Sequence, residues 1–328
     1  MYVAPTFAHC VSLSAPRGGA FRLGAARRRN MRLAVFTKNY TNPAYGAARL
    51  GAERAAAVFG DEVLHFVPKK GDDPDEQSAL IAEALALQPR PDAFVFSPVH
   101  ATKVDPAIRQ VVAAGIPMIG FVNPIDAAPM VSYVSSDDQQ LALAIARYLF
   151  RHLQGKGRVL MVTGPEESYT SLERLRGFHE AAREAPGITF AGQLAGDYVR
   201  EVARDRTATW LQTNAAPDAV LVANDIMAIG VLDALDAAGK TAAVVGVNAI
   251  PQAITAIAEG RMLATADFNA MQMAYLAAEC TARHLRGETV PPRIELPVQI
   301  VDRHNCAQWN LPYEQRPVIT LEQLRSKT

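Results

Sequence analysis

The chain has 328 residues, of which 49% are hydrophobic and 20% are charged, and its 33 basic and 33 acidic side chains give no formal net charge. The length fits about two domains, and the composition is that of a folded protein. A balanced charge gives no general attraction to nucleic acid or anionic lipid, and no apolar run approaches the roughly 18 residues that span a bilayer. The cysteines at 10, 280 and 306 form no Cys-x-x-Cys pair, so we expect neither a disulfide framework nor a thiolate metal site.

Residues 1–30 are rich in Arg, Gly and Ala and show no sustained periodicity. An export signal places its positive charges before its apolar stretch, whereas here the arginines at 27–29 come last. We therefore expect a disordered segment, or a start assigned upstream of the true one at Met31. The segment holds no convincing signal peptide.

From Met31 onward, short β-rich runs alternate with helical stretches. Asn42-Pro43 predicts a helix start, with Asn as the N-cap and Pro in the first turn, and Gly60 predicts its end. Further helices are predicted at 74–88 and 104–114, and strands at 32–37, 63–67, 93–97, 117–122 and 131–135. This βαβα order predicts a parallel sheet with helices on both faces.

The series then restarts, and a repeated pattern supports two like halves. PDAFVFSP (91–98) resembles PDAVLVAN (217–224), and AAGIPMIGFVN (113–123) resembles AAGKTAAVVGVN (237–248). A chance match between alanine-rich α/β segments is the alternative. The predicted helices of this part are 138–153, 170–184, 199–213, 225–238, 250–259 and 269–286, and the strands are 158–163, 188–193, 219–223, 242–247 and 263–268, followed by one extended segment, 294–302.

Ligands of open parallel sheets bind beyond the carboxyl ends of the strands, so the residues just after each predicted strand are the site candidates. Most are Asn, Tyr, Ser or Asp. Such a lining suits a polyhydroxyl ligand, because amides and carboxylates bond hydroxyls while rings pack on C–H faces. The candidates include Lys38, Asn39, Asn42, Tyr45, Asn123, Ser136, Asp197, Tyr198, Asn224, Asn248, Asp267, Phe268 and Asn269.

Motifs for other chemistries are absent from the sequence. The first strand–helix turn, TKNYTNPAYG, lacks GxGxxG, and neither a phosphate loop, a GxSxG elbow nor HExxH occurs. The carboxylates Asp197 and Asp267 could serve an enzyme, although hydroxyl binding or helix capping is favoured for them. Structural roles compete at other candidates: helix capping for Asn42 and Asp225, surface exposure for Arg174 and Tyr198, and tail packing for Trp309.

The chain resembles the type I periplasmic sugar-binding proteins of the ribose-binding group, which serve ABC importers. The resemblance is carried by NPAYGAARLGAERAAAVFG, TSLERLRGFHEA, VLVANDIMAIGVLDALDAAGK, VVGVNAIPQAITAIAEGRMLAT and LPVQIVDRHN. It implies an α/β fold of two Rossmann-like lobes, joined by a hinge of three crossovers, that close on a sugar. The lobes are expected at 31–136 plus 264–298 and at 137–263 plus 299–315, with a tail at 316–328. Effector domains of the lactose-repressor family share this fold.

The same resemblance implies ligand contacts, with three departures from the family. Val122-Asn123 stands where ribose binders have Asp-Arg, Val247-Asn248 where they have Phe-Asp, and Asp267-Phe268-Asn269 where they often have Gln. Because two carboxylates that bind sugar hydroxyls in the family are replaced, ribose itself is not the expected ligand. The expected ligand site is Asn39, Asn42, Tyr45, Asn123, Ser136, Arg174, Tyr198, Asn224, Asn248, Asp267 and Asn269.

These inferences predict a solute-binding receptor that captures a monosaccharide or polyol for an ABC permease in the membrane. No catalytic residue, metal or cofactor is predicted, nucleic acid is not an expected partner, and a monomer is expected. The alternatives are a sensor partner of a kinase, a transcription regulator and an enzyme on the same fold. Residues 1–30 are too short to supply the DNA-binding domain that a regulator needs. The resemblance implies the periplasm, and the cytoplasm is the alternative.

Overall fold

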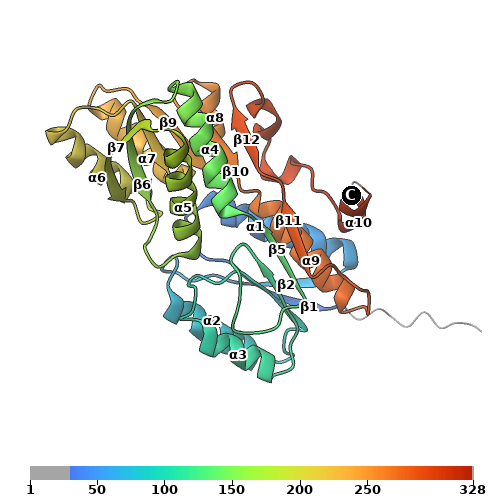
Figure 1. The fold of residues 1–328 in the computed structure, drawn as a ribbon. Helices are drawn as coiled ribbons and strands as arrows, with labels where there is room; N and C mark the ends of the chain where they lie inside the picture. Colours follow the sequence, from blue (N-terminus) through green and yellow to red (C-terminus); the bar gives the residue numbers. More distant parts are fainter. Residues whose placement is uncertain (1–29, 327–328) are drawn as a thin grey trace, which may run out of the picture.

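The computed structural model describes residues 30–326, which form two α/β lobes, each built on a six-stranded sheet (Figure 1). The segment predicted to be disordered lies, up to residue 29, outside the described residues. The predicted two-lobed fold with parallel-dominated sheets is confirmed. No helix in the described part of the chain is long and apolar enough to cross a membrane.

The first lobe has the strand order β11-β5-β4-β3-β1-β2, and all neighbouring strands are parallel. Helices α1 and α9 pack together over β1 to β5, and α2 and α3 pack together over a separate apolar cluster. The elements are β1 (Arg32–Phe36), α1 (Pro43–Phe59), β2 (Glu62–Phe66), α2 (Pro74–Ala86), β3 (Ala93–Phe96), α3 (Asp105–Ala113), β4 (Met118–Phe121), β5 (Ser132–Ser136), α9 (Ala270–His284) and β11 (Arg293–Leu296).

The second lobe has the order β12-β10-β9-β8-β6-β7, in which only β12 runs antiparallel to its neighbour. Helices α4 and α5 pair with each other, as do α6 and α7. The elements are α4 (Asp138–His152), β6 (Lys156–Thr163), α5 (Tyr169–Glu184), β7 (Gly187–Ala195), α6 (Arg200–Thr213), β8 (Ala219–Val222), α7 (Asp225–Ala237), β9 (Ala243–Val247), α8 (Pro251–Ala258), β10 (Ala264–Asp267) and β12 (Gln299–Asp302).

The two sheets have the same connectivity. Strands β3 and β8 carry the two copies of the repeated Pro-Asp-Ala pattern. Strand β3 lies between β1 and β4, and β8 lies between β6 and β9. The repeat read from the sequence therefore corresponds to equivalent strand–helix–strand units.

Close packing of the helices depends on small residues. Asn42 caps α1 and Gly60 ends it in a left-handed conformation, as predicted. A Cβ at Gly51 would lie 2.1 Å from the carbonyl oxygen of Met271, so this glycine lets α1 approach α9. Gly177 has the same role between α5 and α4, where a Cβ would lie 2.3 Å from the Gln139 oxygen.

The chain passes between the lobes three times: after β5, after β10 and between β11 and β12. Two expectations about this region need correction. The return to the first lobe was expected at residue 264, but β10 pairs with β9 and β12 and belongs to the second sheet, so the crossing comes after Asp267. The extended segment 294–302 is two strands in different sheets, because a break at 297–298 carries the chain from one lobe to the other.

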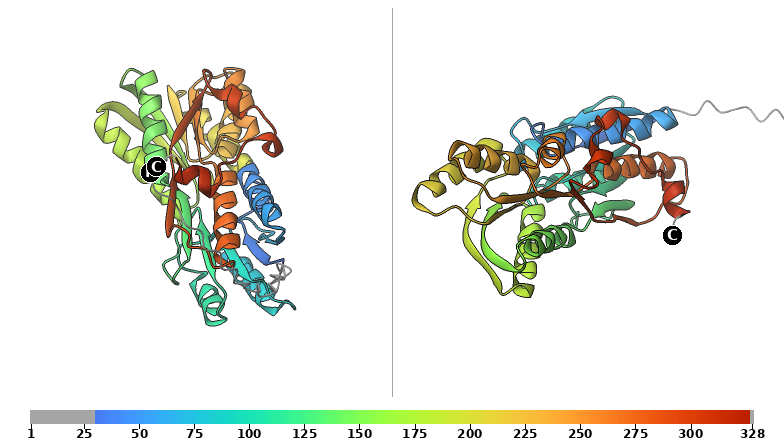
Figure 2. Two further views of the ribbon diagram at one scale, coloured as in Figure 1. Left: turned by 90° about the vertical axis from the view of Figure 1, so that its right-hand side faces the viewer. Right: turned by 90° about the horizontal axis from the view of Figure 1, so that it is seen from above.

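The residues after β12, 303–325, form a C-terminal segment that contacts both lobes (Figures 1 and 2). It comprises the short helices η1 (Cys306–Trp309), η2 (Tyr313–Gln315) and α10 (Leu321–Arg325). The first contacts α8 of the second lobe, whereas the other two contact α1 and α9 of the first. Gln272 Nε2 of α9 donates to the carbonyl oxygen of Ile319, and Gln272 Oε1 accepts from the N–H of Ile319.

Candidate functional site

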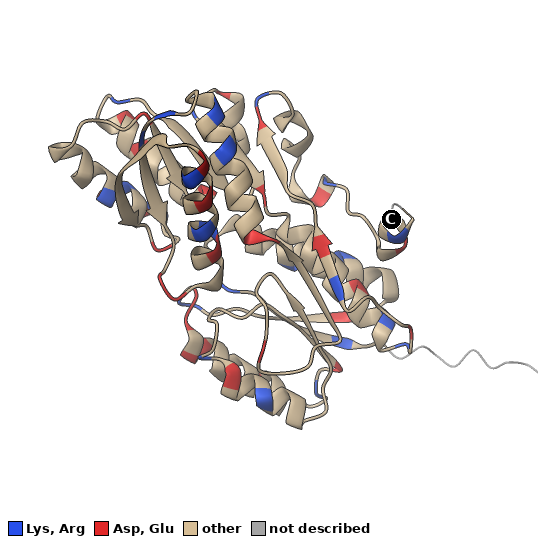
Figure 3. Ribbon diagram, viewed as in Figure 1, with Lys and Arg blue, Asp and Glu red and all other residues tan. Residues whose placement is uncertain are grey.

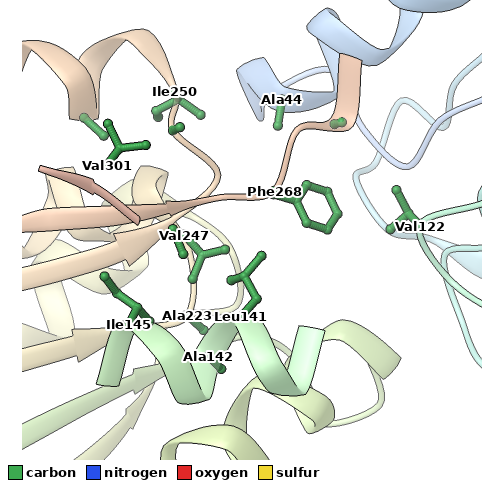
Figure 4. Close-up of a cluster of buried hydrophobic side chains, with 14 of the residues drawn as sticks. Ala44, Val122, Leu141, Ala142, Ile145, Ala223, Val247, Ile250, Phe268 and Val301 are labelled. Atoms are coloured by element: carbon green, nitrogen blue, oxygen red, sulfur yellow. The ribbon is translucent and has the colours of Figure 1, made fainter. Parts of the chain in front are cut away.

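A small pocket lies where the carboxyl ends of the strands of the two lobes face each other. Phe268 reaches it from the second crossover, and Figure 4 shows its ring pointing toward Val122 of the first lobe. The other lining residues are Lys38, Asn39, Asn42, Tyr45 and Asp72 from the first lobe and Thr170, Arg174, Tyr198, Asn224 and Asn248 from the second.

Two lining asparagines also begin helices. The Oδ1 of Asn42 accepts from the N–H of Ala44, and the Oδ1 of Asn224 accepts from the N–H of Met227, both at 3.0 Å. The sequence offers helix capping and ligand contact as alternative roles for Asn42. In the structure Asn42 caps α1 and also lines the pocket. At α7 the cap is Asn224 and not Asp225, the residue expected there.

Asp225, at the start of α7, is bonded to β10 and to the residue before α8. Its Oδ1 accepts from the Thr265 hydroxyl at 2.7 Å, and its Oδ2 accepts from the N–H of Ile250 at 3.1 Å. Burial raises the pKa of Asp225 to about 7. This carboxylate therefore fixes the strand ends that carry Asn224 and Asn248.

Arg174 is a buried residue, not the surface residue weighed as an alternative. Its side chain is 2% exposed; Nε donates to Asp138 Oδ1 at 2.8 Å and Nη1 donates to the Ala223 oxygen at 2.6 Å. The guanidinium carbon lies 5.0 Å from the centre of the Phe268 ring, within range of a cation–π contact. Burial raises the pKa of Asp138, and the neighbouring Arg174 opposes that shift.

A second ion pair lies on the first-lobe side. Lys38 is 1% exposed, and its Nζ lies 3.3 Å from Asp72 Oδ1, while Asn39 Nδ2 donates to Asp72 Oδ2 at 2.9 Å. Asp72 was missed from the sequence because it lies in the loop before α2, away from any strand end. Lys38 and Phe268 follow predicted strands but are not among the expected ligand contacts. Thr170 lies on a helix, where the rule of strand ends does not apply.

The two tyrosines bring aromatic faces and hydroxyls to the pocket. Tyr198 has a left-handed backbone, with φ of 60°, and its buried hydroxyl has no hydrogen-bond partner among the described residues. A Cβ at Gly164 would lie 2.4 Å from this ring, so glycine makes room for it. Burial raises the pKa of both Tyr45 and Tyr198, so both hydroxyls stay protonated.

Four residues of the expected site do not line this pocket. Asn123 is bonded internally, donating to the Pro98 oxygen at 2.9 Å and accepting from Thr170 at 2.8 Å, and Ser136 is buried. Asp267 and Asn269 line a second pocket, on the side of the C-terminal segment. There Asp267 accepts from Trp309 Nε1 at 3.0 Å, and Asn269 caps α9. Asn248 borders both pockets.

Polar contacts also join the lobes at the edge of the pocket. Glu167, before α5, lies 3.1 Å from His100 Nε2 and 2.5 Å from Lys103 Nζ of the first lobe. We refer to these three residues as the rim bridge. Together with the bond between Asn123 and Thr170, it holds the lobes against each other.

Charges elsewhere give no indication of a different site. Basic and acidic residues are interspersed over both lobes in Figure 3. Among residues 30–326, no group of three or more His, Cys, Asp or Glu side chains is placed to hold a metal ion. Cys280 and Cys306 are free and buried.

Two like lobes, three crossovers and a polar pocket between the lobes define a bilobal binding protein. The chain belongs to the periplasmic binding protein family, whose domain model matches residues 33–289. This is a family of binding proteins.

Individual relatives are distant. The chain is 26% identical to a putative rhizopine-binding protein of Rhizobium meliloti, over 66% of this chain and 74% of the relative. It is 25% identical to the D-ribose/D-allose-binding protein of Pseudomonas aeruginosa, over 82% and 88%. An ABC transporter solute-binding protein from Actinobacillus succinogenes, solved with D-allose, is similar in structure, with a TM-score of 0.79, 25% identity, and coverage of 85% of this chain and 99% of that one.

Proposed function

We propose that this protein is a receptor that captures a small polyhydroxyl ligand in the pocket between its lobes. The observation that carries the proposal is the lining, which joins polar side chains of both lobes with three aromatic rings. Hydroxyls bond amides and charged groups, while the C–H faces of a sugar or polyol pack on rings. The relatives named for D-ribose, D-allose and rhizopine support this ligand class.

The proposed ligand contacts are the lining residues Asn42, Tyr45, Arg174, Tyr198 and Asn224, together with Lys38, Asn39, Asp72, Thr170, Asn248 and Phe268. Each hydrogen bond contributes about 0.5–1.5 kcal/mol net, so several of them with ring contacts reach the roughly −8 kcal/mol of a micromolar complex. Binding without chemical change is the proposed activity.

The proposed destination of the ligand is an ABC permease in the membrane, with the receptor acting as a monomer in the periplasm. Membership of the periplasmic binding protein family supports both the location and the importer. A sensor kinase that recognises the ligand-bound receptor is the alternative partner. Co-purification with a detergent-solubilised permease, or with a kinase, distinguishes the two.

Isothermal titration with a panel of pentoses, hexoses, inositols and alditols tests ligand capture. Asn42→Ser keeps a residue that caps helices well but removes the amide nitrogen, so affinity for any binding member should fall about tenfold with little change in stability. Asn214→Ser makes the same substitution at an exposed residue that follows α6, outside the pocket, and should leave affinity unchanged. Absence of binding across the panel would refute the proposal.

A further inference from the structure

The pocket offers its ligand more hydrogen-bond donors than acceptors, and the helix caps are one reason. Asn42 and Asn224 each commit Oδ1 to a backbone N–H of the helix that they begin. The amide nitrogen is therefore the end of each side chain that is left for the pocket, one from each lobe. Neither amide can turn its oxygen to the ligand without losing the cap.

The two buried cations add further donors. Arg174 uses Nε and Nη1 for Asp138 and Ala223, which leaves the two hydrogens of Nη2. Lys38 carries three hydrogens on Nζ, and its ion pair with Asp72 engages one of them. Each lobe thus contributes one cation and the amide nitrogen of one helix-capping asparagine.

The acceptors of the lining are fewer. Each oxygen of Asp72 accepts once, from Lys38 or from Asn39, and keeps one further acceptor site, and the hydroxyls of Tyr45 and Tyr198 each accept as well as donate. Asp138, the partner of Arg174, lies outside the lining, and its buried Oδ2 has no hydrogen-bond partner among the described residues. Asn248 Oδ1 is a buried lining acceptor without a partner among the described residues, and the Thr170 oxygen remains after its hydrogen has gone to Asn123.

This imbalance bears on the chemical class of the ligand. A hydroxyl that accepts from one of these donors brings a hydrogen of its own, which needs an acceptor in turn. A carboxylate oxygen accepts two bonds and brings none. Helices α1 and α7 also begin at the pocket, and helix N-termini favour negative charge.

We propose that the ligand is a sugar acid, whose carboxylate accepts from Lys38 and Asn42 of one lobe and from Arg174 and Asn224 of the other. The proposal rests on the polyhydroxyl ligand proposed above and narrows it. The hydroxyls of the acid donate to Asp72, Thr170 and Asn248. Because the carboxylate touches both lobes, it also links them.

Isothermal titration with matched sets of equal chain length tests the proposal: D-ribonate, D-ribose and ribitol, and the corresponding gluconate, xylonate and galactonate sets. Charge-assisted bonds are about twice as strong as neutral ones, so an acid should bind at least about tenfold more tightly than its aldose and alditol. Lys38→Met should abolish most of this preference. Lys70→Met, at an exposed lysine whose side chain is 81% accessible, should preserve it.

The outcomes are distinct. Neutral sugars that bind as tightly as their acids, or more tightly, overturn the sugar-acid proposal and leave the receptor function standing. An acid preference that Lys38→Met leaves intact also overturns the assigned contacts. If neither acids nor neutral members bind, the receptor function and the sugar-acid proposal fail together.

Discussion

Replacing Asp138 by Asn should destabilise the protein through the charge that it leaves behind. Asp138 on α4 and Arg174 on α5 are paired at 2.8 Å, with each side chain 2% exposed. The bond to Ala223 and the contact with Phe268 hold the guanidinium in place, so it cannot turn into solvent. Breaking a buried pair from one side costs about 3–5 kcal/mol, and we expect about 3 kcal/mol here because the amide oxygen still accepts from Nε.

The same two helices supply a matched control. Arg147 on α4 and Glu184 on α5 are paired at 2.6 Å, but their side chains are 44% and 45% exposed. Glu184→Gln removes the same charge at a solvated position and should cost less than about 1 kcal/mol. The chemical change and the helix pair are the same, and the positions differ in burial and in the helix end that they occupy. Asp138 begins α4 and Glu184 ends α5, which adds roughly 1 kcal/mol to the expected difference.

Urea unfolding of the ligand-free protein, followed by circular dichroism, measures both variants. Adding Arg174→Met to Asp138→Asn should recover part of the loss, because the uncompensated charge is then gone. The reasoning is refuted if Asp138→Asn costs no more than Glu184→Gln. It is also refuted if the double variant loses the sum of what Asp138→Asn and Arg174→Met lose separately.

Three further predictions concern pH, the rim bridge and the C-terminal segment. The pKa of Asp225, about 7, is above the roughly 3.9 of an unfolded Asp, so the folded state holds this proton more tightly and the free energy of unfolding should fall as pH rises from about 4 to about 7. Urea unfolding at several pH values should show that fall, and an equally steep fall in Asp225→Asn would contradict the assignment. Glu167→Gln should weaken ligand binding about two- to threefold at low salt and less at high salt, and a salt-independent loss in titrations would count against the rim bridge. Trp309→Phe should cost about 1–3 kcal/mol by leaving Asp267 short of a donor, and a loss no larger than that of Trp210→Phe, at the other tryptophan, would contradict this role.

Periodicity and helix-end residues predicted the alternating strands and helices, which leave few topologies to consider, and the repeat predicted two like halves. The two lobes and their three crossovers came from the resemblance to the sugar-binding family. The expected return to the first lobe was misplaced because β10 and the crossover that follows form one uninterrupted run in the sequence. The division of 294–302 was missed for the same reason. Strand pairing within each sheet decides both points, and no local pattern encodes it.

The site was predictable where the rule of strand ends applies, as for Asn42, Asn224 and Asn248. It was not predictable where a loop folds back, as at Asp72, or where a helix side chain turns inward, as at Thr170. Asn123 follows a strand as expected, but its amide is bonded to Pro98 and Thr170. Position after a strand places a residue near the pocket, and the hydrogen-bond partners then decide which way its side chain points.

The attachment of α10 to α9 has a practical consequence for anyone who wishes to watch this molecule at work. Residue 30 leads directly into β1, and residue 325 ends the helix that contacts α9, so both ends of the described chain are fastened to the same lobe. Fluorophores attached at residues 30 and 325 would move with the same lobe and report little of a hinge rotation. A single dye on α6 of the opposite lobe, paired with either end, would follow that rotation.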